Sequence, residues 1–224
     1  MADRAAKDAL FDGLAAGARA LSSGRRAEIV DLLAQGERSV EDIAGEIGQT
    51  VANTSHHLRV LLRAGLVRTR RDGNRIYYGL AGDGVAQLWA LMRDVATEHV
   101  AEIDRLASAY LGDRRHLQVM TRAELTQRLA RGDVLVIDVR PEPEYQSGHI
   151  SGALSVPIRE LRRRLRQLPR DADVVAYCRG HFCVYADEAV RTLSRRGIRA
   201  VRLEDGFPEW ARAGLPVETR SQPA

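Results

Sequence analysis

Residues 174–193 read VVAYCRGHFCVYADEAVRTL, and they decide how the C-terminal half of the chain is organised. The apolar run 174–177 predicts a buried strand, and apolar residues at 186, 189, 190 and 193 predict one face of a helix. The loop 178–183 between them holds both cysteines of the chain. Backbone N–H groups are unpaired at a helix start, and the helix dipole favours negative charge there.

This position predicts a lowered thiol pKa and a nucleophilic Cys178, with Arg179 and His181 adding positive charge. The alternative is that both cysteines are small apolar packing residues at a strand end. A loop that combines two cysteines, two basic residues and a glycine favours the reactive interpretation.

The composition describes a chain long enough for two small domains, with 224 residues, 45% hydrophobic and 29% charged. No signal-peptide pattern opens the sequence, and no apolar run reaches the length of a membrane span. We therefore expect a cytoplasmic protein without a membrane partner. In a reducing compartment, two cysteines indicate a reactive pair rather than a structural disulfide.

Positive charge is concentrated in one part of the N-terminal half. Residues 50–79 carry six arginines against one aspartate, a net charge of +5, whereas residues 1–112 have 14 basic and 15 acidic residues. A local cationic patch on a nearly neutral domain is typical of a nucleic-acid site.

The same region has the pattern of a winged helix-turn-helix. Helices are expected over 5–20, 24–35, 39–48 and 50–64, with Ser39 and Thr50 as N-caps. Residues 66–80 predict a β-hairpin, because Asp72-Gly73 between two alternating runs is a strong turn signal.

The helix over 50–64 is the expected reading head for DNA. Val51 and Ala52 suit thymine methyl groups, and arginines of the hairpin suit phosphates or a narrow minor groove. The alternative is a solvated polar helix face. The predicted DNA-binding residues are Thr50, Asn53, Thr54, Ser55, His56, His57 and Arg59 on the helix and Arg70, Arg71 and Arg75 on the hairpin.

A long helix is expected over 84–111, because apolar residues recur every three or four positions. Together with helix 5–20 it predicts a homodimer interface. His99 lies within this apolar pattern and is interpreted as an interface histidine rather than a metal ligand.

Residues 20–80 resemble the DNA-binding domain of the ArsR family of bacterial repressors. The segments that carry the resemblance are 20–22, 32–37, 55–61, 64–67 and 72–75. The resemblance implies a homodimer on double-stranded DNA with a two-fold symmetric operator. Family members often carry cysteine metal ligands on the helix before the reading head, where residues 40–47 have none, so no metal site is predicted.

Short apolar strands alternate with helices after a linker expected at 112–116, which predicts an α/β domain with a parallel sheet. Sites in such sheets lie at the carboxyl ends of the strands, where the cysteine loop falls. The expected organisation is therefore an α+β winged helix-turn-helix domain over 1–111, this domain over 117–219 and a tail over 220–224.

Residues 117–219 resemble a single rhodanese domain. The resemblance is carried by 137–140, Glu144-Tyr145, 148–153, Pro157, the cysteine loop, and 206–217. It implies that Cys178 carries sulfur as a persulfide and that backbone N–H groups of the loop residues Arg179, Gly180, His181 and Phe182 cradle the outer sulfur. It further implies that Asp138 and Arg140 brace the loop.

Members active on thiosulfate often hold a cation where this chain has Cys183, which indicates a different use of the loop. Cys183 can attack a Cys178 persulfide and give a disulfide or a sulfur-bridged pair. No cofactor is implied. The arginines at 159, 162, 163, 164, 166 and 170 predict a solvated helix face, or a surface for DNA or an anionic donor.

These observations predict a DNA-binding transcription regulator whose rhodanese domain senses or transfers sulfane sulfur, with redox sensing through the two cysteines. Two alternatives stay open. One is a sulfurtransferase without allosteric coupling to DNA, and the other is a sensor of arsenic or another thiophile bound by Cys178 and Cys183.

Overall fold

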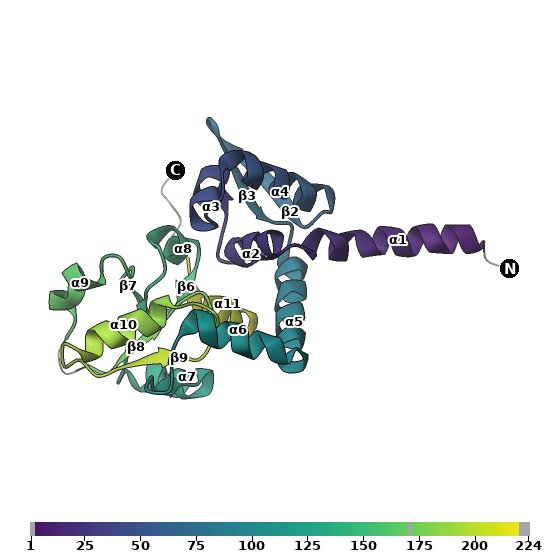
Figure 1. Ribbon diagram of the computed structural model, residues 1–224. Coiled ribbons are helices and arrows are strands. Elements are labelled where there is room, and N and C mark those ends of the chain that lie inside the picture. The colour runs from purple at the N-terminus through teal and green to yellow at the C-terminus, as the bar shows by residue number, and fades with distance from the viewer. Residues whose placement is uncertain (1–2, 170–171, 220–224) are drawn as a thin grey trace. The chain divides into compact units, whose positions relative to one another are not determined.

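The computed structural model describes residues 3–169 and 172–219, and the chain forms two compact units, Met1–His99 and Val100–Ala224 (Figure 1). Each unit is described by itself. The helices of the first unit are α1 (Arg4–Leu21), α2 (Gly24–Leu33), α3 (Val40–Glu46), α4 (Val51–Arg63) and α5 (Asp83–His99), and its strands are β1 (Arg38–Ser39), β2 (Val67–Asp72) and β3 (Arg75–Leu80).

The first unit folds because local signals start and stop its helices at the expected places. Ser39 caps α3 by accepting a hydrogen bond from the backbone N–H of Asp42, and Thr50 caps α4 by accepting one from Asn53. Gly73 supplies a positive φ of 57° at the turn between the antiparallel strands β2 and β3. The result is the predicted winged helix-turn-helix, with α3 and α4 followed by the wing β2–β3.

The core of the first unit consists of apolar residues from α2, α3 and α4. Ile29, Val30, Ile43, Leu58 and Leu61 are completely buried. This packing fixes which side of α4 turns inward and which side stays in solvent.

One predicted helix of this region is wrong. Residues 84–111 do not form a single helix, because Val100 adopts an extended conformation with φ −113° and ψ 93° between α5 and α6 (Ala101–Leu111). The apolar spacing continues through both segments, so periodicity alone cannot reveal a one-residue break. The division between the two units falls at this break, whereas the sequence predicts a linker at 112–116.

The second unit is built on a parallel sheet with the strand order β4-β9-β8-β5-β7. A separate antiparallel pair joins β6 and β10. The strands are β4 (Val119–Met120), β5 (Leu135–Asp138), β6 (His149–Ile150), β7 (Leu154–Ser155), β8 (Val174–Tyr177), β9 (Ala200–Leu203) and β10 (Val217–Glu218). The helices are α6, α7 (Arg122–Arg131), α8 (Glu142–Ser147), α9 (Leu161–Arg164), the 3₁₀ helix η1 (Leu165–Gln167), α10 (Tyr185–Ser194) and α11 (Phe207–Arg212).

The central strand β8 is buried on both faces of this sheet. Val174 and Ala176 join one core cluster with α10, and Val175 and Tyr177 join another with α7 and α11. The alternation follows from the pleat of the strand, which sends successive side chains to opposite faces. Cys178 directly follows β8 and lies in the cluster on the α10 side.

Candidate functional site

The loop between β8 and α10 carries both cysteines at the carboxyl end of the central strand. Gly180 has a φ of 143°, and the N–H of Cys183 donates to the Gly180 carbonyl at 3.0 Å, which curls the loop. The start of α11 lies close against this loop. A Cβ placed on Gly206 would come within 2.2 Å of the backbone nitrogen of Gly180, so only glycine fits there.

The Cys178 thiol lies 3.8 Å from the Cys183 carbonyl oxygen and 3.9 Å from the Gly180 carbonyl oxygen, to which it donates. Burial raises the pKa of Cys178, which is 4% exposed, and the neighbouring Cys183 side chain raises it further. The Cys178 side chain lowers the pKa of Cys183, as do the backbone N–H groups of Tyr185 and Arg179. The predicted low pKa of Cys178 is therefore wrong in direction, because the thiol lies inside the core, and the thiol whose pKa is lowered is that of Cys183.

The positive charge next to the loop also differs from the prediction. Arg179 forms an ion pair with the buried Glu144 of α8 at 2.5 Å and stacks over the ring of Tyr185 at 5.4 Å. Its charge is therefore largely compensated, although it still lowers the pKa of Cys183. His181 is exposed, and its ring makes an edge contact with Phe182. A third cation, Arg202 of β9, interacts electrostatically with Cys178 and is only 9% exposed.

Arg114 contacts the loop and the start of α10 with all three of its guanidinium nitrogens, and it comes from the segment that the sequence interprets as a linker. Its Nε atom lies 2.5 Å from Oδ2 of the buried Asp187. Its two terminal nitrogens donate to the carbonyl oxygens of His181 and Cys183, each at 2.9 Å. Asp187 Oδ1 lies 3.7 Å from Nε of Arg202. One carboxylate thus lies between two arginines beneath the cysteine loop.

Asp138 and Arg140 form a completely buried ion pair at the end of β5, with Nη2 and Oδ2 at 2.6 Å. Arg140 also donates to the Gly148 carbonyl at 2.6 Å. The hydroxyl of Tyr177 donates to Asp138 at 2.6 Å. Since Tyr177 directly precedes Cys178, this network holds the strand end from which the loop starts.

The solvent-facing side of α4 presents a mixed set of polar and apolar side chains. Thr50, Asn53, His56 and Arg59 are exposed, together with Val51 and Ala52, and Ser55 is half-buried. Thr54 is completely buried, so its prediction as a DNA contact is wrong. It lies one helical turn from Leu58 on the face that packs into the core.

His57 is half-buried, and burial together with nearby Arg26 and His56 lowers its pKa. It is therefore neutral near pH 7 and adds no charge to the cationic face.

The predicted wing arginines differ in how far they are already paired with other groups of the protein. Arg70 pairs with Glu37 at 2.8 Å and with Asp72 at 3.3 Å, and its guanidinium lies over the ring of Tyr77 at 4.8 Å. Arg71 donates to the Gly73 carbonyl at the hairpin turn. Arg75 is exposed and has no acidic partner among residues 3–169 and 172–219. Of the three, Arg75 is the most available for a phosphate.

Large apolar side chains on α1 and α5 are uncovered, and we call them the apolar stripe of the first unit. They are Leu10, Phe11 and Leu14 of α1 and Leu88, Leu91, Met92 and Val95 of α5. Their exposure ranges from 39% for Met92 to 69% for Leu14. His99 is exposed beside Glu98 at the end of α5.

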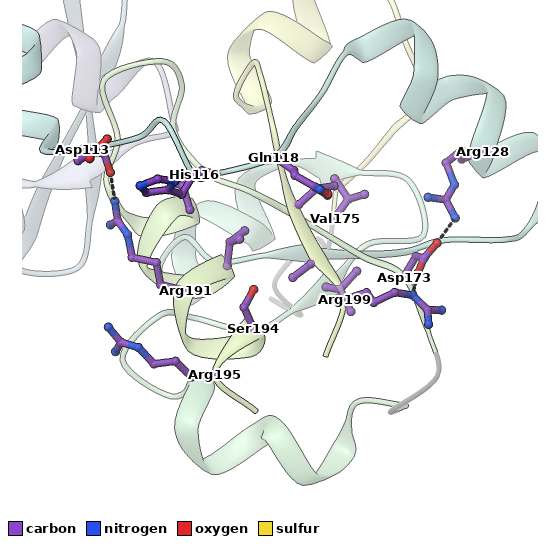
Figure 2. A pocket seen from close by; sticks show the side chains of 15 residues that line it. Asp113, His116, Gln118, Arg128, Asp173, Val175, Arg191, Ser194, Arg195 and Arg199 are labelled. Atoms are coloured by element: carbon purple, nitrogen blue, oxygen red, sulfur yellow. Dashed lines mark hydrogen bonds and ion pairs between the residues drawn. The ribbon is translucent and has the colours of Figure 1, made fainter. Parts of the chain in front are cut away.

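A pocket of about 760 Å³ lies at the opposite end of the sheet from the cysteine loop (Figure 2). Its floor is made by the first residues of β8 and β9, and its rim carries Arg128, Arg191, Arg195 and Arg199. Asp173 compensates two of these arginines, through ion pairs with Arg128 at 2.8 Å and Arg199 at 2.5 Å.

The predicted basic surface at 159–170 is exposed at positions 159, 162, 163 and 166, whereas Arg164 pairs with Glu160 at 2.7 Å. Arg170 and the predicted tail at 220–224 lie outside the described residues. Among residues 3–169 and 172–219, no group of three or more His, Cys, Asp or Glu side chains is arranged to hold a metal ion. In the same part of the chain, no helix has the length and hydropathy needed to span a membrane.

Comparison with known proteins finds a matching family for each of the two units. Residues 23–69 match the bacterial regulatory protein, arsR family, and residues 121–213 match the rhodanese-like domain. The chain is 49% identical over 212 residues to the HTH-type transcriptional regulator Rv0324 of Mycobacterium tuberculosis, covering 95% of this chain and 93% of the relative. This chain belongs to the arsR family of bacterial regulatory proteins. Its C-terminal unit is a rhodanese-like domain, which confirms the predicted fold class.

Two further relatives each match one unit. A sulfurtransferase of Allochromatium vinosum is 40% identical over 95 residues, covering 42% of this chain and 87% of the relative. The solution structure of a homodimeric winged helix-turn-helix DNA-binding domain from Mycobacterium bovis is 48% identical. It covers 46% of this chain and 93% of that domain, with a TM-score of 0.42.

Sequence reasoning missed Arg114, Asp187 and Arg202 around the cysteine loop. A signal for Asp187 was present, because it follows Ala186 at the start of an apolar helix face and a carboxylate placed there needs a cation. Nothing in the local pattern indicates that Arg114, 73 residues away, supplies it.

Proposed function

We propose that this arsR-family regulator binds operator DNA as a homodimer and senses or transfers sulfane sulfur through Cys178. The observation that carries the sulfur chemistry is the curled loop at the end of β8, which holds the buried Cys178 thiol 3.8 Å from the carbonyl oxygen of the second cysteine, Cys183. Amide N–H groups of Gly180 and Ala186 point at the Cys178 sulfur, and those of Arg179 and Tyr185 point at the Cys183 sulfur. Such convergent donors stabilise negative charge on sulfur.

The pKa order assigns a first role to Cys183. Its thiolate accepts the proton of Cys178, and the resulting Cys178 thiolate attacks the sulfane sulfur of the donor. A new sulfur–sulfur bond forms at Cys178, the sulfur–sulfur bond of the donor breaks, and the electron pair leaves on the donor's thiolate. Cys178 then carries the persulfide, and Cys183 carries the proton.

The second role of Cys183 is to resolve the persulfide. After losing its proton, Cys183 attacks the Cys178 sulfur, a Cys178–Cys183 disulfide forms, and the outer sulfur leaves as hydrosulfide with the electron pair. The two thiols are thereby oxidised, and the transferred sulfane sulfur is reduced to sulfide. The closeness of the two residues supports this step, because the Cys178 sulfur lies 3.8 Å from the Cys183 carbonyl oxygen.

The DNA-binding part of the proposal rests on α4 and the wing. Exposed Asn53 and His56 suit base edges, and the free Arg75 suits a phosphate. The apolar stripe of α1 and α5 supports a homodimer, because several large apolar side chains exposed on each of two helices are typical of an interface that a partner covers. Two identical reading heads require a two-fold symmetric operator.

Mass spectrometry of the full chain after treatment with inorganic polysulfide tests the sulfur chemistry. The parent should gain one sulfur at low donor and form the internal disulfide at higher donor. Cys183→Ser should accumulate the Cys178 persulfide, and Cys178→Ser should gain no sulfur at the loop. Sulfur uptake by Cys178→Ser at residues 178–183 would refute the assignment.

Binding of a thiophile such as trivalent arsenic is the second candidate, and two free cysteines in one curled loop favour it. It predicts stoichiometric binding by the parent without sulfur turnover, and loss of binding in either cysteine variant. A third candidate, sulfur transfer without coupling to DNA, predicts persulfide formation with unchanged operator affinity.

A further inference from the structure

Arg114 contacts the cysteine loop in a way that the sulfur chemistry alone does not require. Its side chain is 16% exposed, and the side chain of Asp187 is 1% exposed. One nitrogen pairs with Asp187, and the other two donate to the carbonyls of His181 and Cys183. All three arms of the planar group are thus used, which a lysine ammonium cannot reproduce with the same geometry.

The two carbonyl contacts fix the orientation of two peptide groups in the loop. In a planar trans peptide the C=O and the following N–H point in opposite directions. Holding the carbonyls of His181 and Cys183 on Arg114 therefore turns the N–H groups of Phe182 and Val184 away from it. In this orientation the N–H groups of Phe182 and Val184 point away from Arg114, toward the other side of the loop, where they can donate to an anion.

Arg114 also belongs to a segment that is attached to both ends of α10. Asp187 lies in the first turn of α10, and Arg191 further along donates to the Asp113 carbonyl at 2.9 Å (Figure 2). Residues 113–114 directly follow Gly112, the C-cap of α6. A change at Cys183 therefore acts on the backbone next to α6 through a single side chain.

We infer that Arg114 is the positioning residue of the cysteine loop and that it couples the sulfur state of the loop to the segment 112–116. The inference rests on the proposed function for its sulfur chemistry. The Cys183 carbonyl lies on the same residue whose sulfur attacks the persulfide. Movement of Cys183 toward Cys178 on bridging pulls that carbonyl away from Arg114 and releases one of the bonds that hold the segment.

Arg114→Lys in the full chain is the sharpest test, because it keeps the charge opposite Asp187 and loses the forked contact with the carbonyls. Amide hydrogen exchange over 179–184 should rise, and sulfur uptake from inorganic polysulfide should slow about tenfold, as expected for lost charge-assisted hydrogen bonds. Once persulfidated to completion, this variant should show no donor-dependent change in operator affinity. Arg115→Ala is the matched control, since Arg115 is exposed and pairs with Asp113 instead, and it should behave as the parent.

A second measurement follows the effect of the cysteine loop on the segment around Arg114. Oxidation of the parent with diamide, which joins the two cysteines, should raise amide exchange over 113–118. In Arg114→Lys this exchange should already be high and should not change on oxidation.

The outcomes distinguish a failure of the Arg114 inference from a failure of the proposed sulfur chemistry. Parent-like loop exchange and parent-like sulfur uptake in Arg114→Lys would overturn the inference and leave the proposed function standing. If the parent takes up no sulfur, the proposed function fails. Hydrogen exchange over 113–118 and 179–184, compared between the parent and Arg114→Lys, then still shows whether Arg114 positions the loop.

Discussion

The outer face of α4 and the cysteine loop differ in how their side chains are held. On α4, Asn53 and His56 project into solvent from a helix whose other face packs into the core. In the loop, Cys178 is buried, the nearby Asp187 and Arg202 are buried with it, and Arg114 is half-buried.

The difference reflects what each site must do. A DNA-reading face gains from side chains that are free to meet a large, charged partner. A reactive sulfur gains from dipoles and charges that are fixed before the reaction and shielded from water. We therefore expect substitutions in the second unit to cost folding stability, and substitutions on α4 to change binding with little effect on folding.

The largest effect on stability is expected for Asp138→Asn. The substitution leaves the Arg140 guanidinium buried without its carboxylate, which costs about 3–5 kcal/mol of unfolding free energy. Urea unfolding followed by circular dichroism measures this loss. Asp133→Asn is the matched control, because its ion pair with Arg128 is solvent-exposed and contributes little to stability. Equal losses in both variants would contradict the proposed bracing of the loop.

Operator binding should separate base contacts from phosphate contacts. Asn53→Ala should weaken binding to the preferred operator by about 1–3 kcal/mol and relax its sequence preference. Arg75→Ala should weaken binding to all sequences and lower the salt slope by about 1. Arg70→Ala should lower the slope less, because Arg70 is already paired with Glu37 and Asp72. A larger slope change for Arg70 than for Arg75 would show that the wing pairs open on DNA.

The lowered pKa of Cys183 predicts a pH effect on alkylation by iodoacetamide. In the parent, Cys183 should react with a midpoint below the ordinary pKa of a free cysteine, because the neighbouring Cys178 side chain lowers its pKa. Cys178→Ala removes that side chain, so the midpoint for Cys183 should move to higher pH. A midpoint that does not move would show that backbone N–H groups alone lower the pKa of Cys183.

The smallest effect is expected for Thr54→Val. The Thr54 hydroxyl is buried and lacks a hydrogen-bond partner within the described part of the chain, so a methyl group in its place removes an unsatisfied polar atom. Unfolding free energy should stay equal or rise by up to about 1 kcal/mol, and operator affinity should not change. Weaker DNA binding in this variant, with a stable fold, would show that α4 turns its Thr54 face toward DNA.

The parts of the fold set by neighbouring residues could be predicted from the sequence. The caps at Ser39 and Thr50 and the turn at Gly73 lie where the pattern placed them. The break at Val100 could not be predicted, because the apolar period runs on through it.

The same limit applies to the site. The two cysteines and their loop follow from local spacing, but their electrostatics depend on Arg114 and Arg202, which come from distant segments of the chain. The lowered pKa predicted for Cys178 was wrong because of its burial. The position at a helix start favoured a lowered pKa, and burial reversed the shift.

The most direct test of the central claim is the affinity of the full chain for its operator, measured at fixed salt before and after inorganic polysulfide. The account predicts that the parent changes its affinity, and that reduction with dithiothreitol restores it. Cys178→Ser should keep the affinity of the untreated parent in both conditions. An unchanged affinity in a parent whose Cys178 persulfide is confirmed by mass spectrometry would contradict coupling between the sulfur site and DNA binding.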